Sequence, residues 1–265
     1  MINSTIDVHT IACLSDNYAY VIHNRTTGTA AVVDIPEAGP IVAKIAELSV
    51  PVTEIFLTHH HWDHIDGLDD LQKALTNQLG QKPSRVIGAQ VDAHRLPPMD
   101  QAVIPGQTIQ LCGIDGQIFD VSGHTLGHLA LHIPAIKAVF TADSLMAMGC
   151  GRLFEGTPAQ MWQSLLKLRD LPGDTLVYSG HEYTASNMAF AQSLGEANFA
   201  VASRAAQITE DRATGKATVP SLLELELQTN PFLRADDPAL QTAMGLSGEV
   251  ASDVFAKIRA LKDKF

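Results

Sequence analysis

The segment best suited to chemistry is Ile55–His64, where an apolar stretch passes directly into the letters His-His-His-Trp-Asp-His. In an extended chain, His59 and His61 project to the same side, because side chains alternate with a period of two. The chain then turns, which allows Asp63 and His64 to approach the side chains of His59 and His61. Imidazoles and a carboxylate form a donor set suited to Zn²⁺, with Fe or Mn as alternatives. A polar loop of unrelated histidines, the competing interpretation, fits this constrained spacing poorly.

Three further polar residues each follow an apolar run. His124 comes after Val121-Ser122-Gly123, Asp143 comes after Phe140-Thr141-Ala142, and His181 comes after Tyr178-Ser179-Gly180. A single histidine or aspartate after a strand is more often a structural residue than a ligand. Each one is therefore a weak candidate by itself, and a metal site requires that the fold bring them to the histidine-rich loop.

Short apolar runs bounded by turn residues predict the strands that would position these side chains. The predicted strands are Tyr20–Ile22, Ala30–Val33, Glu54–Thr58, Arg85–Ile87, Thr108–Leu111, Gln117–Val121, Leu129–Ile133, Ala138–Thr141 and Leu176–Ser179. Helical patterns lie between some of them, at Ile41–Leu48, Leu68–Leu79 and Pro158–Leu168, the last with Thr157 as its N-cap. Some of the predicted strands follow one another directly, as in hairpins, and others are separated by a helix, as in crossovers. This mixture indicates an α/β sandwich with helices on its outer faces.

The pattern changes after Tyr183, where helices are predicted at Thr184–Leu194, Ala197–Ala213 and Gly248–Lys264. The last helix carries an apolar stripe of Val250, Val254, Ile258 and Leu261. We therefore expect two domains, a first domain over residues 1–182 that carries the candidate ligands and a smaller helical domain over residues 183–265.

Composition excludes several classes of protein. The 265 residues are 46% hydrophobic and 18% charged, which suffices for a core, and the net charge of −11 disfavours nucleic acid and anionic membranes as partners. The three cysteines form no CxxC motif, so we expect neither a disulfide scaffold nor a thiolate zinc site. The first residues lack a basic start and an apolar run, so the expected location is the cytoplasm.

The motifs together resemble the metallo-β-lactamase superfamily, in the order HHHWDH, GHTLGH, an aspartate after FTA, and SGHEYT. The run Gly149–Thr157, the segments HEYT and NPFLR, and the closing RALKD are similar to the hydroxyacylglutathione hydrolase (glyoxalase II) family. The resemblance spans essentially the whole chain. It implies a four-layer αββα sandwich, with a smaller C-terminal helical domain that binds substrate.

The resemblance also implies a ligand set for two divalent metal ions. His59, His61 and His124 would hold one ion, while Asp63, His64 and His181 would hold the other. Asp143 would bridge them, and the pair would share a hydroxide. Asp63 is in addition a candidate proton acceptor.

The implied reaction is hydrolysis of the thioester of S-(2-hydroxyacyl)glutathione, with S-D-lactoylglutathione as substrate, in methylglyoxal detoxification. The implied glutathione-binding residues are Arg152, Tyr183, Arg259 and Lys262. One helical turn separates Arg259 from Lys262, and a solvated helix surface is the alternative interpretation of that pair. The chain is expected to act as a monomer. Competing functions on the same fold are a glutathione persulfide dioxygenase and another hydrolase such as a lactonase.

Neighbours of the ligand residues receive structural interpretations. His60 and Trp62 alternate away from the ligand side and are expected to pack behind the loop. His128 is expected to be structural or to lie next to a ligand. Asp16-Asn17-Tyr18 resembles a family segment near the site, without an assigned chemical role.

Overall fold

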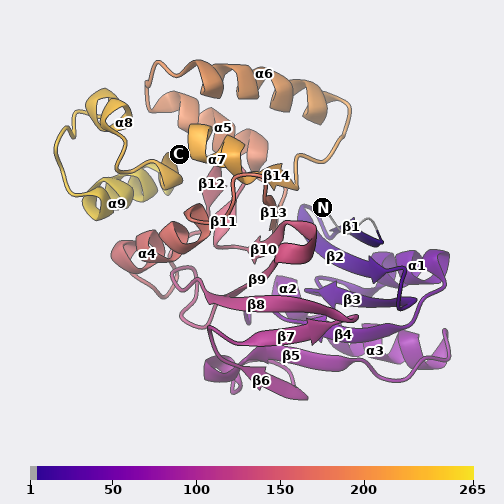
Figure 1. The fold of residues 1–265 in the computed structure, drawn as a ribbon. Coiled ribbons are helices and arrows are strands. Elements are labelled where there is room, and N and C mark those ends of the chain that lie inside the picture. Colours follow the sequence, from indigo (N-terminus) through magenta and orange to yellow (C-terminus); the bar gives the residue numbers. More distant parts are fainter. Residues whose placement is uncertain (1–4) are drawn as a thin grey trace. The chain divides into compact units, whose positions relative to one another are not determined.

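A computed structural model of the chain describes residues 5–265, and its backbone contacts divide it into two compact units (Figure 1). The first unit consists of the chain up to Asp120 together with Gly127–Phe140. The second consists of Val121–Leu126 together with Thr141–Phe265. The division expected at residue 182 falls inside the second unit, and that boundary stays a prediction.

The first unit contains a six-stranded sheet in the order β1-β2-β3-β4-β5-β6. Its strands are β1 Ile6–Cys13, β2 Asn17–Asn24, β3 Thr29–Val33, β4 Val52–Phe56, β5 Arg85–Ala89 and β6 Gln101–Val103. The first three strands are antiparallel, whereas β3 to β6 run parallel. Parallel strands end at a common edge, so the loops after β3, β4 and β5 meet there.

The same unit contains most of a second, antiparallel sheet. Strands β7 Thr108–Leu111, β8 Ile114–Asp120 and β9 Leu129–Ile133 pair in sequence, and β9 also pairs with the beginning of β10 Ala138–Ala142. The two sheets are packed together, since the rings of Tyr20 and Phe140 lie 5.4 Å apart. A polar contact also joins them, because Asn24 Nδ2 donates to the Cys112 carbonyl at 2.9 Å.

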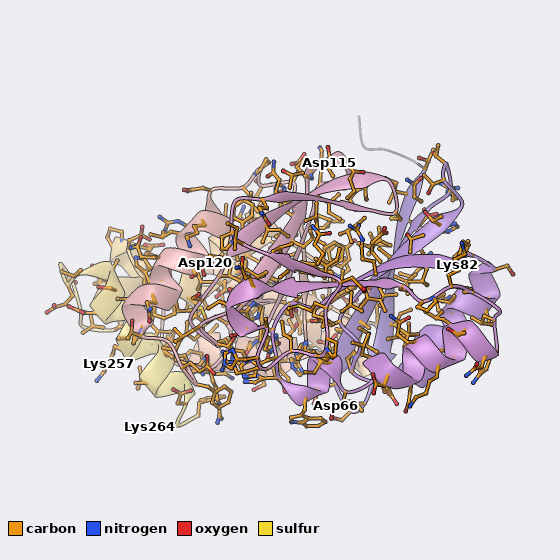
Figure 2. The ribbon with its side chains drawn as sticks, turned by 90° about the horizontal axis from the view of Figure 1, so that it is seen from below. Asp66, Lys82, Asp115, Asp120, Lys257 and Lys264 are labelled. Carbon is orange, nitrogen blue, oxygen red and sulfur yellow. The ribbon has the colours of Figure 1, made fainter. Side chains whose placement is uncertain are left out.

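Helices α1 Ala38–Leu48 and α3 Leu68–Asn77 pack against each other, and α1 contacts β1 and β2 (Figure 1). The short helix α2 Trp62–Ile65 continues the histidine-rich loop, while η1 Gln90–Asp92 follows β5 and η2 Pro134–Ile136 follows β9. Exposed charged side chains lie on both units, among them Asp66, Lys82 and Lys257 (Figure 2).

The second unit joins small strands to a set of helices. It contains the end of β10, the hairpin β11 Leu145–Met146 and β12 Gly149–Cys150, and the antiparallel pair β13 Leu176–Ser179 and β14 Ser221–Leu222. Its helices are α4 Pro158–Arg169, α5 Thr184–Ser193, α6 Phe199–Ala213, α7 Leu223–Thr229, η3 Pro231–Leu233, α8 Pro238–Ala243 and α9 Ala251–Lys262. None of the helices in residues 5–265 is long and apolar enough to cross a membrane.

Two local predictions for this unit have different outcomes. Thr157 caps α4 as expected, in a reciprocal capping box with Gln160. The apolar stripe predicted for the last helix is wrong at its ends, because the side chains of Val250 and Leu261 are exposed. Phe255 is buried in their place and packs against Trp162 and Phe232.

Candidate metal centre

The histidine-rich loop leaves the end of β4 and gathers its imidazoles within the first unit. The ring of His59 lies 4.8 Å from that of His61 and 4.3 Å from that of His64, measured between centroids. His59 and His64 are fully buried. Asp63 Oδ2 lies 3.9 Å from His64 Nε2. The structure thus brings together all four residues that the motif singled out.

Asp34, directly after β3, fixes the orientation of this loop. Its Oδ1 accepts the Thr58 N–H at 2.8 Å, and its Oδ2 accepts the Thr58 hydroxyl at 2.7 Å. The same Oδ2 lies 2.8 Å from His64 Nδ1. Because a carboxylate only accepts hydrogen bonds, His64 must carry its proton on Nδ1. The Nε2 lone pair of His64 is then the one that can bind a metal.

Two other contacts hold the loop, and sequence reasoning assigned neither. Asn17, at the start of β2, donates from Nδ2 to the Asp63 carbonyl at 2.9 Å and to its carboxylate at 3.1 Å. His60 Nδ1 lies 3.4 Å from Asp92 Oδ2, beside the loop after β5. The side chain of His60 is thus largely covered, whereas Trp62 does not pack behind the loop as expected, since 64% of it is exposed.

His128 belongs to the surroundings of this cluster. Its ring stacks on that of His59, with centroids 4.5 Å apart and planes inclined by 13°. It is fully buried, which agrees with the expectation that it lies next to a ligand.

In the second unit, Asp143 lies between two histidines, just after the end of β10. Its Oδ2 is 3.4 Å from His124 Nε2, and its Oδ1 is 3.4 Å from His181 Nε2. All three side chains are buried. His124 Nδ1 lies 2.8 Å from the Arg152 carbonyl, which can only accept, so the proton of His124 is on Nδ1. Its Nε2 lone pair consequently faces the carboxylate.

This arrangement fits a bound cation on each side of Asp143. A lone pair and a carboxylate oxygen repel one another at close approach, whereas a positive ion between them satisfies both. Each oxygen of Asp143 has its own imidazole partner, as a carboxylate that bridges two metals requires. Nitrogen and oxygen donors of this type suit Zn²⁺, Fe or Mn.

Two exposed aromatic rings lie against these histidines. Phe154 meets the ring of His124 edge-on, with centroids 5.2 Å apart. Tyr183, just before α5, stacks on His181 at 4.6 Å with planes only 7° apart. The rings leave apolar surface beside the polar groups, as a site for an organic ligand requires.

The expected substrate-binding cations gather in the same unit. Two of them meet at Asp263, whose Oδ1 lies 2.9 Å from Arg259 Nη2 and 3.9 Å from Arg152 Nε. Lys262 Nζ donates to the Ser186 carbonyl at 3.2 Å and to its hydroxyl at 3.1 Å. Burial lowers the pKa of Lys262, and the positive charges of Arg259 and Arg152 lower it further. Arg152 is exposed, whereas Arg259 is 4% exposed. Arg259 donates from Nη1 to the Cys150 carbonyl at 2.9 Å and from Nη2 to Asp263 at 2.9 Å. It therefore supports the backbone of the run Gly149–Thr157 directly.

Comparison with known proteins adds independent findings. Residues 16–181 match the family described as the metallo-beta-lactamase superfamily, and residues 182–265 match the family described as the hydroxyacylglutathione hydrolase C-terminus. A protein of Ruegeria pomeroyi named hydroxyacylglutathione hydrolase is 56% identical, over 98% of this chain and 99% of its own. A protein of the same name from Jannaschia sp. strain CCS1 is 54% identical, over 97% of each chain.

Among solved structures, the crystal structure of ETHE1 from Myxococcus xanthus resembles this fold with a TM-score of 0.65. The similarity covers 96% of this chain and 90% of that one, at 22% sequence identity. At that identity the likeness bears on the fold alone.

Proposed function

We propose that this chain, which belongs to the hydroxyacylglutathione hydrolase family of the metallo-beta-lactamase superfamily, hydrolyses the thioester of S-(2-hydroxyacyl)glutathione. The expected substrate is S-D-lactoylglutathione, and the products are glutathione and D-lactate. The observation that carries the proposal is Asp143, whose two oxygens face two different imidazole nitrogens. That geometry suits a two-metal hydrolase.

The proposed ligands for two divalent ions come from both sets of side chains. His59, His61 and His124 would hold one ion. Asp63, His64 and His181 would hold the other, with Asp143 between them. Zinc is the proposed metal, with iron or manganese as alternatives that the same donors accept. When bound, such a pair supplies a hydroxide at neutral pH and polarises a carbonyl group.

The chain's own residues then perform three tasks. Asp63, held by Asn17, is placed to accept a proton, which makes it a proposed catalytic residue beside Asp143. The exposed Arg152 and the half-buried Lys262 would attract the anionic glutathione, and Tyr183 would contact it beside His181. A thiol has a pKa of about 8.5, so the thiolate leaves without a strong general acid.

Arg259 is proposed to assist binding mainly through its neighbours. Its guanidinium is bound to Cys150 and Asp263 and lies over the ring of Phe232. A rigid Arg259 would keep the backbone before Arg152 in place, while it adds positive charge near Lys262. The helical segment 183–265 is proposed to be the substrate-binding domain on these grounds.

The experiment is a thioester hydrolysis assay combined with metal analysis. Purified protein loaded with Zn²⁺ should consume S-D-lactoylglutathione, with loss of thioester absorbance and release of one thiol per turnover. Failure of metal-loaded protein to do so would reject the assignment. Oxygen uptake with glutathione persulfide and iron-loaded protein would instead support a dioxygenase, and lactone hydrolysis a lactonase.

We further propose that the protein acts as a monomer in the cytoplasm. Its three cysteines are all free thiols and all buried, which is usual for a protein of a reducing compartment. Light scattering in solution would show the oligomeric state directly.

A further inference from the structure

The turn between β11 and β12 is bound by side chains from the C-terminal helices. Asn230 donates from Nδ2 to the carbonyls of Met146 and Gly149, each at 3.0 Å. Asn187 of α5 donates to the Ala147 carbonyl at 3.1 Å. The Met148 N–H donates to Glu226 Oε2 at 2.9 Å. Each residue of this turn thus has a backbone group bound by a side chain from 183–265.

Met148 adds a second anchor at the tip of the turn. Its φ of 59° lies in the left-handed region, which a residue with a side chain adopts only where its surroundings impose it. Its side chain is fully buried in an apolar cluster with Ala191, Val201 and Ile208 of α5 and α6. The tip therefore depends on the helices for its conformation.

Glu226 of α7 is the central group of this polar network. It is fully buried, and its Oε1 accepts from Arg204 of α6. Its Oε2 accepts both the Met148 N–H and Asn230 Nδ2, the latter at 3.0 Å. Arg204 also donates to the Thr229 hydroxyl at 2.6 Å. The carboxylate thus accepts hydrogen bonds on both sides and offers no proton to either.

The turn is joined to the residues proposed to bind metal by a short, tight path. Strand β11 begins two residues after Asp143, and β12 runs into Gly151, whose N–H donates to the Ser144 carbonyl at 3.2 Å. A Cβ on Gly151 would lie 2.0 Å from the Asp143 carbonyl, so the two backbones are in direct contact. The next residue, Arg152, accepts His124 Nδ1 through its carbonyl.

We propose that Glu226 is a positioning residue for the metal centre, which acts through the β11–β12 turn on Asp143 and His124. The proposal rests on the proposed function for the identity of these two ligands. It assigns the helical segment a role beyond substrate binding, because α5, α6 and α7 would set the geometry of a bridging carboxylate. Metal affinity would then depend on a carboxylate that touches neither metal nor substrate.

The test is the metal affinity of Glu226→Gln, measured by competition between the protein and a chromogenic chelator for Zn²⁺. Glutamine keeps the shape but places an NH₂ group against either Arg204 or the Met148 N–H, where only an acceptor fits. We expect the affinity for Zn²⁺ to fall by about tenfold, the lower end of the range for a direct partner of a ligand, because Glu226 acts through the turn. The melting temperature of the metal-free protein measures the folding cost separately.

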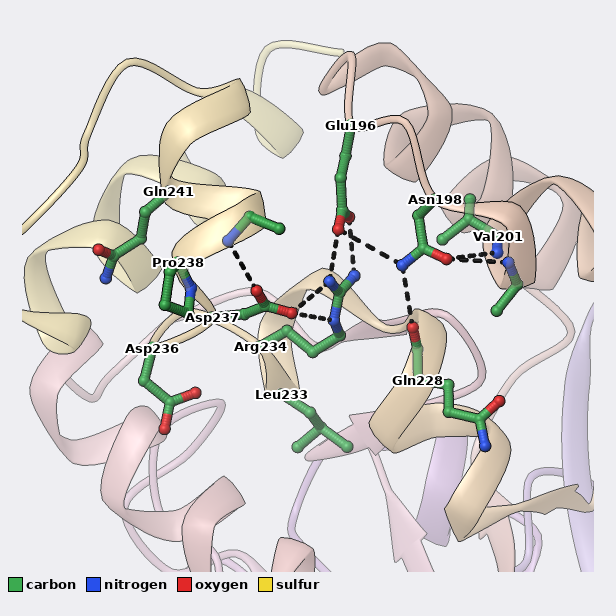
Figure 3. A network of polar contacts seen from close by, with 12 residues as sticks. Glu196, Asn198, Val201, Gln228, Leu233, Arg234, Asp236, Asp237, Pro238 and Gln241 are labelled. Atoms are coloured by element: carbon green, nitrogen blue, oxygen red, sulfur yellow. Dashed lines mark hydrogen bonds and ion pairs between the residues drawn. The ribbon is translucent and has the colours of Figure 1, made fainter.

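A second arginine–glutamate pair in the same unit, in which Arg234 is buried and Glu196 is largely covered, provides the control. Arg234 donates to Glu196 through two nitrogens and to Asp237, and Asn198 links Glu196 to the Gln228 carbonyl (Figure 3). The network in Figure 3 orders the loop before α6, the end of α7 and the start of α8, away in sequence from Asp143 and from the β11–β12 turn. Glu196→Gln should therefore lower the melting temperature but leave the affinity for Zn²⁺ within about twofold.

The outcomes separate this proposal from the proposed function. A folded Glu226→Gln protein with unchanged affinity for Zn²⁺, or an equal loss in Glu196→Gln, would overturn the role of Glu226. If Glu226→Gln does not fold, Asn187→Ala replaces it, with an expected loss of about 3–10-fold, and unchanged affinity there would likewise overturn the proposal. Wild-type protein that binds Zn²⁺ but leaves the thioester intact would refute the function while the positioning role stands.

Discussion

Replacement of Asp34 by asparagine changes one atom of the metal centre's support and should weaken metal binding more than folding. Asparagine tolerates left-handed backbone, so the φ of 56° at this position persists. Its carbonyl oxygen can still accept the Thr58 N–H. Its NH₂ group then takes the place of Oδ2, which now accepts from the Thr58 hydroxyl and from His64 Nδ1.

The consequence for His64 follows from its two tautomers. An NH₂ group can only donate, so His64 Nδ1 must become the acceptor and its proton must move to Nε2. A protonated Nε2 has no lone pair for a metal. Either the hydrogen bond or the metal contact is lost, and we expect the affinity for Zn²⁺ to fall by about 10–100-fold, or about 1.4–2.8 kcal/mol.

The stability of the metal-free protein should change much less. The Thr58 hydroxyl can rotate and accept from the new NH₂ group, so one hydrogen bond is weakened and the cost is about 1 kcal/mol. Asp100→Asn is the matched control, because Asp100 accepts a backbone N–H from Val86 at 2.8 Å.

The assay for both variants is chelator competition for Zn²⁺, with thermal unfolding of the metal-free proteins alongside. Asp34→Asn with the affinity of the wild type would refute the tautomer argument. A loss of stability of several kcal/mol without metal would show that Asp34 acts on folding instead.

Three further predictions follow from the pKa shifts and contacts. Burial raises the pKa of Cys13 and Cys150 to about 11 and that of Cys112 to about 12. At pH 8 only about one in a thousand of the Cys13 and Cys150 thiols is then ionised, so Ellman's reagent should label the three thiols only after denaturation. Above the ordinary thiol pKa of about 8.5, these thiols ionise in the unfolded protein but not yet in the folded protein. The free energy of unfolding should therefore be unaffected by them below that pH and should fall as the pH rises towards about 11. Lys262→Met should raise KM about tenfold through loss of a charge-assisted contact with the substrate, and an unchanged KM would remove Lys262 from the binding site. The melting temperature should fall only slightly, because the two hydrogen bonds from Lys262 Nζ to Ser186 are lost while burial already disfavours the ammonium.

The sequence pattern predicted the elements that are buried along their whole length. It failed for strands that are only partly buried and for strands of two residues. Strand β9, for example, is buried throughout and was predicted to the residue. Strand β1 was not predicted, because it lies at the sheet edge and His9 and Thr10 interrupt its apolar pattern. The strands β11 and β12 have two residues each, too few for any periodicity.

The errors in side-chain burial have a similar origin. Trp62 was expected to be packed because it alternates away from His61, but the chain enters α2 at that residue and alternation no longer applies. Val250 continues the helical spacing of α9, yet it precedes the first helical turn and is exposed. In both cases a change of backbone conformation, which the spacing does not report, decided the outcome.

The ligands of the histidine-rich loop were found because their pattern is local, and the family resemblance supplied His124, Asp143 and His181. The residues that hold the loop and the β11–β12 turn are distant along the chain from their partners. Asp34 is 30 residues from His64, Asn17 is 46 residues from Asp63, and Glu226 is 78 residues from Met148. Parallel pairing explains the first case, since β3 and β4 end at the same edge. No spacing in the sequence encodes the other two, which depend on the packed fold.

The ligands and the groups that orient them come from different parts of the chain, so the histidine motif alone does not determine metal binding. An imidazole binds metal more tightly through one nitrogen when an acceptor holds the N–H of the other, and here oxygen acceptors outside the motif impose that state on His64 and on His124. A chain with the same motif but without Asp34, or with a β11–β12 turn displaced from Arg152, would keep its donor atoms and lose their tautomer and direction. We therefore expect metal affinity in this chain to depend on Asp34 and on the β11–β12 turn, in addition to the histidine motif.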